Sequence, residues 1–134
     1  MTALPFLDSN VIIYAYSADS RSAIAKQILL EGAIVSVQVL NEFASVARRK
    51  LGFDWQKINI ATNQIIALCE PVIELSLTLQ KDTRALAERY QFSIYDACIV
   101  AAALEAKCDM LYSEDMQDGM VIEGRLTIRN PFAA

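Results

Sequence analysis

The sequence predicts an α/β fold in which helices cover both faces of a mostly parallel sheet. Short apolar runs alternate along the chain with longer segments of helical periodicity, an order typical of parallel sheets. The alanine-rich segment 94–107 is apolar on nearly all sides, which predicts a buried helix that a sheet can approach closely. The 134 residues contain no repeat and no low-complexity linker, so we expect one domain, residues 1–134.

The first half of the chain predicts two strands and four helices. Side chains that cap an N-terminus mark the helix starts, and glycine or basic residues mark the helix ends. Ser9 or Asn10 is expected to cap the first helix, Ser36 the third and Asp54 the fourth. The expected elements are, in order, a strand over 3–7, helices over 10–17 and 21–30, a strand over 33–37, and helices over 37–50 and 55–69.

The second half of the chain begins at Pro71 and predicts three further strands and two helices. Segment 79–90 is amphipathic, with apolar residues on one helical face and charged residues on the other. Ser93 is the expected cap of the buried alanine-rich helix. The expected elements are a strand over 72–75, helices over 79–90 and 94–107, and strands over 109–112 and 126–128.

The composition excludes several classes of chemistry. The chain has no histidine, which excludes Ser-His and Cys-His catalysis and any zinc site with histidine ligands. Its three cysteines have no C-x-x-C spacing, and their odd number argues against a disulfide framework. With neither a signal peptide nor an apolar run of the ~18 residues that span a membrane, we expect a soluble cytoplasmic protein. The net charge of −4 restricts any nucleic-acid contact to a local basic patch.

The expected elements place four carboxylates at the same edge of the sheet. Asp8 comes directly after the first strand, and Asp115 follows the strand at 109–112. Glu42 lies in the second turn of the helix after the second strand, and Asp96 lies in the first turn of the buried helix. Sites in parallel sheets form beyond the carboxyl ends of the strands, so we expect these acids to converge. Each acid alone also has a plainer interpretation, as a helix cap, a partner of the helix dipole or a solvated residue.

Convergence of four acids has an electrostatic consequence. Two ionised carboxylates ~6 Å apart at an effective dielectric of ~20 repel each other by about 3 kcal/mol, a large part of the ~5–15 kcal/mol that stabilises a domain. Either some acids are protonated or a divalent cation neutralises them. Oxygen ligands without histidine favour Mg²⁺ or Mn²⁺. Such a cluster suits phosphodiester hydrolysis, because the cation activates a bound water and supplies the base that the composition lacks.

Four stretches of the chain resemble a known family: "FLDSNVIIYA", "VSVQVLNEFASVARRK", "FSIYDACIVAAALEAKCDMLYSEDMQDG" and the closing "IRNPF". Together they are similar to the PIN domain and, more narrowly, to the VapC-type toxin ribonucleases of bacterial toxin–antitoxin systems. The resemblance runs in order over essentially the whole chain. It implies a three-layer α/β/α sandwich, Mg²⁺- or Mn²⁺-dependent cleavage of RNA, a homodimer, and a small antitoxin protein that holds the nuclease in check.

The resemblance also implies roles for individual residues. The four metal-binding and catalytic acids would be Asp8, Glu42, Asp96 and Asp115. Neighbouring polar groups would orient these carboxylates: Ser9, Asn10 and Ser113. The basic candidates for contact with RNA phosphates are Arg48, Arg49 and Lys50, which also have the plainer interpretation of a solvated helix end. Spacing alone also leaves Asp118, three residues after Asp115, as a candidate for an additional acid at the outside of the site.

Single residues decide which other protein classes remain compatible with these acids. A haloacid-dehalogenase-like phosphotransferase needs a second acid two positions after the first, where this chain has Asn10. A receiver domain needs a lysine after a late strand, and none stands near Ser113. The alternative that remains is a PIN-like binding module with weak or no catalysis, which acts mainly through a protein partner.

Overall fold

The strands of the computed structural model, which describes residues 3–133, form two short sheets joined by a bridge. The larger sheet has the order β1-β4-β6-β5, and the smaller pairs β2 with β3. A parallel bridge between Phe6 and Ile34 joins the two sheets. Among these strands only β5 is antiparallel to its neighbour, β6. The strands are β1 (Phe6–Leu7), β2 (Val35–Ser36), β3 (Val72–Ile73), β4 (Met110–Tyr112), β5 (Val121–Ile122) and β6 (Leu126–Arg129).

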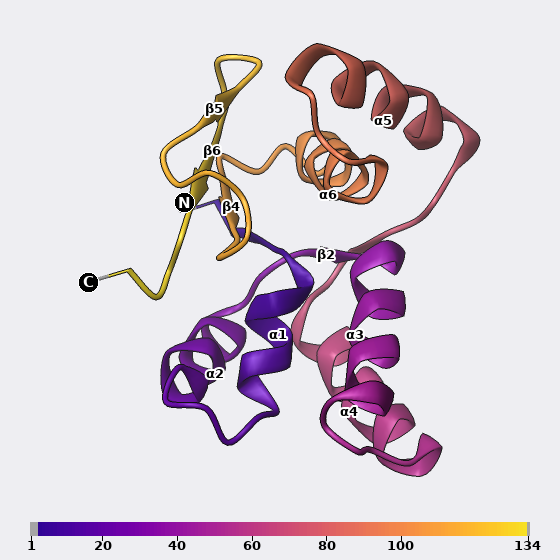
Figure 1. The fold of residues 1–134 in the computed structure, drawn as a ribbon, viewed down its shortest axis with the longest axis vertical. Helices are drawn as coiled ribbons and strands as arrows, with labels where there is room; N and C mark the ends of the chain where they lie inside the picture. The colour runs from indigo at the N-terminus through magenta and orange to yellow at the C-terminus, as the bar shows by residue number, and fades with distance from the viewer. Residues whose placement is uncertain (1–2, 134) are drawn as a thin grey trace.

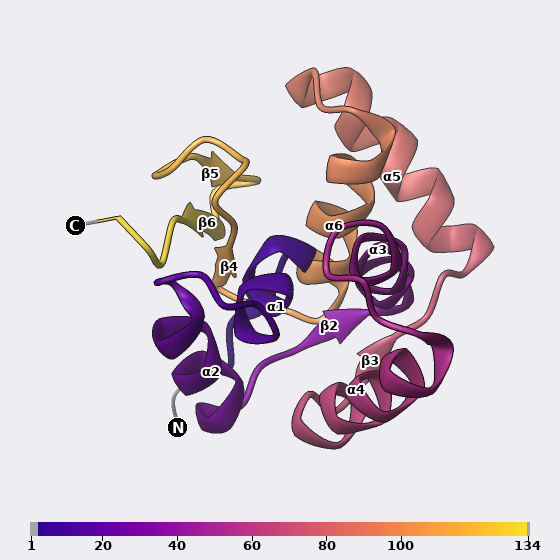
Figure 2. The ribbon, with the colours of Figure 1, turned by 60° about the horizontal axis from the view of Figure 1, so that its bottom comes forward.

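Helices lie on both sides of the strands, which confirms the predicted α/β/α arrangement (Figure 1). α5 packs along α6 on one side, while α1 packs against α2 and α3 on the other. Figure 2 shows β2 leading directly into α3, beside α1 and α6. Within residues 3–133 the helices are α1 (Ser9–Ala15), α2 (Ser22–Glu31), α3 (Val37–Arg49), α4 (Trp55–Leu68), α5 (Leu77–Tyr90) and α6 (Ile94–Glu105). None of these helices combines the length and the apolar character that a membrane crossing requires.

The alanine-rich helix α6 is buried, as predicted. Small side chains allow β2 and β4 to pack closely against it, while α5 covers another face. A run of its residues is at most 3% exposed: Ala97, Ile99, Val100, Ala101, Ala102 and Ala103. Because α6 begins beside the other helix starts, its burial fixes where Asp96 lies.

Side-chain caps set three of the six described helix starts at the predicted residues. Ser36, Ser93 and Asp54 each accept the backbone N–H of the residue three positions on, at 3.3, 3.1 and 2.8 Å. Two starts differ from the prediction. The cap of α1 is Asp8 rather than Ser9 or Asn10, and Ser76 caps α5, which therefore begins before the predicted 79.

β1, β2, β3 and β4 are shorter than predicted, β6 extends one residue further than predicted, to Arg129, and β5 was not predicted. β1 and β2 each keep two residues of five-residue apolar runs, because flanking residues leave the ladder. β5 folds back on β6 through a three-residue connection, residues 123–125. Its first two residues, Glu123 and Gly124, are the central residues of a turn closed by the Arg125 N–H on the Ile122 carbonyl, and have φ values of 52° and 67°. Positive φ at both central residues is the turn geometry that favours hairpins. The signal was the "EG" pair between two apolar runs.

Close packing around α6 gives a stability prediction. Replacing Ala102 with leucine should lower the free energy of unfolding by about 1–3 kcal/mol, because the larger side chain does not fit the fully buried position. Urea unfolding measures the change. The control is Ala67→Leu on an exposed position of α4, which should change the midpoint little. Equal midpoints for the two variants would contradict the close packing of α6.

Candidate active site

Asp8 lies at the junction of β1 and α1 and is only 3% exposed. Its Oδ1 accepts the backbone N–H of Ser9 at 2.7 Å. Its Oδ2 accepts the hydroxyl of Ser113 at 2.8 Å and the amide of Asn10 at 3.2 Å. β1 pairs in register with β4, so the residues that follow the two strands meet. Three neutral donors therefore satisfy a carboxylate that the fold has removed from water.

Glu42 is linked to Asp8 through a single serine. The Ser9 hydroxyl donates to Glu42 Oε1 at 2.8 Å, while the backbone N–H of the same residue donates to Asp8. The other carboxylate oxygen, Oε2, accepts the Gln38 amide at 2.7 Å. The prediction did not include Gln38, although its spacing of four residues from Glu42 on a helix is a recognisable signal.

Asp115 is linked to Asp8 through an asparagine. The Asn10 Nδ2 lies 3.2 Å from Oδ2 of Asp8 and 3.2 Å from Oδ2 of Asp115. Ser113 fixes the connection after β4, because its Oγ accepts the backbone N–H of Asp115 at 3.2 Å. The predicted orienting residues Ser9, Asn10 and Ser113 thus all contact at least one of the predicted acids.

Asp96 reaches the same region from the first turn of α6. Burial raises its pKa above the ordinary 3.8, and the negative charges of Glu42 and Asp115 raise it further, against the Ser93 hydrogen bond. α3 packs against both α1 and α6, so charges on these helices influence one another (Figure 2). The four predicted acids therefore lie at one edge of the sheet.

Charge at this edge is not compensated by basic side chains. Burial raises the pKa of Asp8 to about 6; hydrogen bonds from Ser113 and Ser9 oppose the rise, and the charges of Glu42 and Asp96 add to it. Within residues 3–133, no lysine or arginine forms an ion pair with any of the four acids. The carboxylates are held by neutral groups, so their mutual repulsion persists in the folded protein.

The donor set fits a hard divalent cation in kind, because it consists only of carboxylate, hydroxyl and amide oxygens. In the described part of the chain, no three of these acids come close enough together to hold a metal ion as they stand. Ser9 and Asn10 instead bridge the carboxylates in pairs. The structure therefore brings the carboxylates to one region, but within the described residues it does not place three of them close enough to coordinate one cation.

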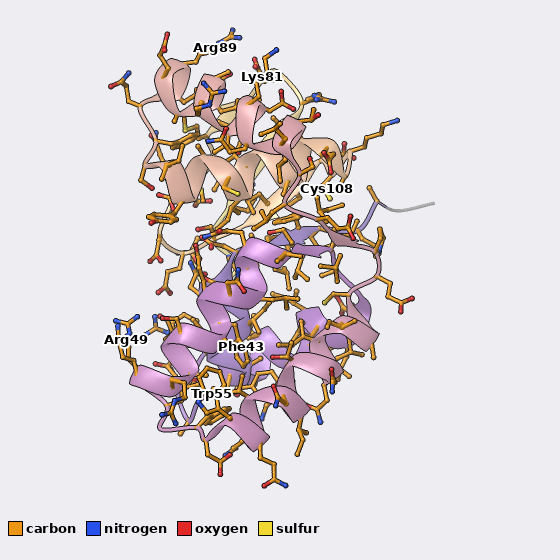
Figure 3. The ribbon with its side chains drawn as sticks, turned by 90° about the vertical axis from the view of Figure 1, so that its right-hand side faces the viewer. Phe43, Arg49, Trp55, Lys81, Arg89 and Cys108 are labelled. Carbon is orange, nitrogen blue, oxygen red and sulfur yellow. The ribbon has the colours of Figure 1, made fainter. Side chains whose placement is uncertain are left out.

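The basic residues at the end of α3 lie apart from the acids. Arg48 follows Glu42 by six residues, about 9 Å along a helix axis. Its Nη1 donates to the carbonyl of Phe53 at 3.2 Å, and its guanidinium lies over the Trp55 ring. Arg49 lies near Trp55 at the same end of the helix (Figure 3). This placement matches the plainer interpretation of Arg48, Arg49 and Lys50 as an exposed helix end.

The acids beside Asp115 have other partners. Asp118 accepts the backbone N–H of Asn130 at 3.0 Å. Glu114 accepts Arg21 Nη1 at 2.8 Å and the Tyr14 hydroxyl at 2.6 Å. The arginine contact could not be predicted, because 93 residues separate its two partners.

The repulsion at this site predicts a pH dependence of stability. The pKa of folded Asp8 is about 6 against an ordinary 3.8, so the folded state binds more protons between these values, and stability falls as pH rises through them. One pKa unit corresponds to about 1.4 kcal/mol, so Asp8 contributes a loss of about 3 kcal/mol between about pH 4 and pH 7. The raised pKa of Asp96 acts in the same direction.

Urea unfolding in the presence of a chelator measures this dependence. The matched variant is Asp8→Asn, which carries no ionisable group at this position and should show a shallower fall over the same range. The same pH slope in both proteins would contradict the assignment of the effect to Asp8.

Comparison with known proteins identifies the family. A family model of the PIN domain matches residues 6–117. Among solved structures, the chain is similar to a toxin-antitoxin complex from Klebsiella pneumoniae, with 20% identity and a TM-score of 0.72, over 97% of this chain and 99% of the other. It is also similar to VapC20 of Mycobacterium tuberculosis, a sarcin-ricin loop cleaving toxin, with 20% identity and a TM-score of 0.68, over 82% and 88% of the two chains.

No curated protein sequence matches the chain. At 20% identity the likeness to the two solved structures concerns the fold. The family model, in contrast, covers most of the sequence, from β1 to the connection after β4 that carries Asp115. The chain therefore belongs to the PIN domain family.

Proposed function

We propose that this protein is a divalent-metal-dependent endoribonuclease, the toxin of a type II toxin–antitoxin system. The observation that carries the proposal is the group of four carboxylates at one sheet edge. Neutral donors hold three of them, and in residues 3–133 no basic side chain pairs with any of the four. Membership of the PIN domain family and the likeness to two toxin structures support the same activity.

The charge of the site supports a requirement for a cation. The chain has a net charge of −4, and an RNA phosphate that approached four carboxylates alone would be repelled. In this proposal Asp8, Glu42, Asp96 and Asp115 hold Mg²⁺ or Mn²⁺. The bound cation would supply the activated water and the charge stabilisation that phosphodiester hydrolysis needs.

The remaining polar groups of the site hold the acids in position. Ser113 and the backbone N–H of Ser9 keep the buried Asp8 directed toward the sheet edge. Asn10 sets the separation between Asp8 and Asp115 by donating to both. The protein thus fixes the direction of its ligands before RNA binds, which lowers the reorganisation that the reaction requires.

The alternative is a PIN-like binding module that is catalytically weak and acts mainly through a protein partner. One observation favours it: in the described residues the acids do not form a closed cluster of three. Cleavage assays with added Mn²⁺ or Mg²⁺ separate the two, because only the nuclease proposal expects product.

We also propose that the chain is a single domain over 1–134, acts in the cytoplasm, forms a homodimer and binds a small antitoxin. The solved complex from Klebsiella pneumoniae supports the antitoxin. An apolar groove between α2 and α4 offers a surface for it, a cavity of about 420 Å³ lined in part by Leu29, Leu30 and Leu68. Lys26 and Lys57 at this groove suit an acidic partner segment.

The first prediction of this proposal concerns the acids. Asp8→Asn and Asp96→Asn should each lower Mn²⁺-dependent RNA cleavage by about 10²-fold or more, because each removes a charged ligand of the cation. The control is Asp118→Asn, which keeps an acceptor for the Asn130 N–H and should retain activity. The measurement is the rate of cleavage of total RNA with mapped ends. Wild-type rates in the Asp8 and Asp96 variants would overturn the assignment.

The second prediction concerns the antitoxin. Leu30 is 70% exposed and lines the groove, so Leu30→Asp should weaken binding of the small protein encoded beside this chain by about tenfold or more while RNA cleavage is unchanged. Ile24→Asp is the matched control, because Ile24 is exposed on the same helix and is not among the residues that line the groove. Calorimetric titration compares the two. Equal weakening by both variants would place the antitoxin elsewhere.

A further inference from the structure

We propose that Gln38 is a positioning residue for Glu42 and sets the affinity of the carboxylate site for its divalent cation. Gln38 lies one turn before Glu42 on α3, and its Nε2 donates to Glu42 Oε2 at 2.7 Å. The inference rests on the proposed function, because it concerns the same group of acids. It assigns a role to a residue that is itself no ligand.

Glu42 is held at both oxygens from two different helices. Ser9 on α1 donates to Oε1 at 2.8 Å, and Gln38 on α3 donates to Oε2. The terminal torsion of a glutamate is broad, so a carboxylate held at one oxygen still rotates. Held at both, its plane is fixed. Gln38 therefore supplies the second constraint that orients this ligand before a cation arrives.

The chemical type of Gln38 matters as much as its position. An ionised carboxylate only accepts hydrogen bonds, so the amide presents its nitrogen to Glu42. A lysine or arginine at this position would also orient the carboxylate but would neutralise it, and would compete with the cation. A neutral donor orients the ligand and leaves its full charge available to the metal.

The surroundings of Gln38 hold its side chain in place. It is half-buried, and it forms part of the wall of a cavity of about 400 Å³ between the starts of α5 and α6. Tyr95, the neighbour of Asp96, lines the same cavity. Gln38 thus lines, from the helix that carries Glu42, a cavity that the start of the helix carrying Asp96 also borders.

The chain contains a second glutamine–glutamate pair with the same spacing, which lies away from the carboxylate site. Gln27 donates to Glu31 at 3.0 Å, again four residues apart on a helix, and both residues are exposed on α2. Such pairs stabilise a helix by similar small amounts wherever they lie. The Gln27 pair therefore reports what an ordinary glutamine–glutamate contact contributes, without the carboxylate site.

The test compares Gln38→Met with Gln27→Met in the full-length protein, since methionine preserves length and removes the amide. Mn²⁺ binding is measured by calorimetric titration, and thermal unfolding is measured without metal. The Mn²⁺ dissociation constant should rise about tenfold or more for Gln38→Met, the usual effect of losing a hydrogen bond that orients a ligand, and stay within about twofold for Gln27→Met. RNA cleavage by Gln38→Met should recover at high Mn²⁺ concentration. Because Mn²⁺ binding also stabilises a folded protein, equal unfolding temperatures of the two variants without metal are what exclude a folding defect.

Glu42→Gln completes a double-mutant cycle. In that background the ionised acceptor is absent, so adding Gln38→Met should change Mn²⁺ affinity by less than about twofold. An unchanged Mn²⁺ affinity of Gln38→Met in the otherwise native chain would overturn the positioning role, whether or not RNA is cut. Weaker Mn²⁺ binding by that variant, in a protein that cuts no RNA, would support the role and reject the nuclease instead.

Discussion

The hydrogen bond from Ser113 to the buried Asp8 is the contact on which the geometry of the site depends. It joins the residue after β4 to the residue after β1, so it requires these strands to pair in their observed register. A slip of one residue would move Asp8 away from the Ser113 hydroxyl and leave the buried carboxylate with only its local donors, Ser9 and Asn10. The same carboxylate caps α1, so one buried group fixes a strand pairing and the start of a helix together.

The way in which the protein holds acids differs between the site and its surroundings. Glu114, beside the site, is neutralised by Arg21, whose guanidinium also lies over the Tyr14 ring. Asp8, Glu42 and Asp115 are held by hydroxyl, amide and backbone N–H groups, which satisfy lone pairs and leave the charge in place. Because the donors are neutral, the carboxylates still repel one another. This repulsion destabilises the fold, and a bound cation would relieve it. Stability is given up locally where the chemistry needs charge, a trade-off that functional sites commonly show.

How much of this structure could be predicted depends on how far apart in sequence the interacting residues lie. The helix caps and the buried α6 were predictable, because residues within a turn of one another decide them. The two-residue strands were not well bounded, because so short an element has no measurable periodicity. The placement of the acids at one edge was expected, since Asp8 and Asp115 follow strands and Glu42 and Asp96 lie near the starts of helices. Their hydrogen-bond partners were not, because contacts such as Ser9 to Glu42 and Ser113 to Asp8 join residues 33 and 105 positions apart.

The connection after β4 shows why such contacts decide the assignment of the fourth acid. Three acids lie close together in sequence there, and spacing alone does not separate Asp115 from Asp118. Arg21 neutralises Glu114, and a backbone N–H beyond β6 engages Asp118, which ties the connection to the sheet. Asp115 alone among the three accepts from Asn10, the amide that also reaches the buried carboxylate at the start of α1. Its charge is thus both uncompensated and directed toward the other acids, which is the combination that a cation ligand requires.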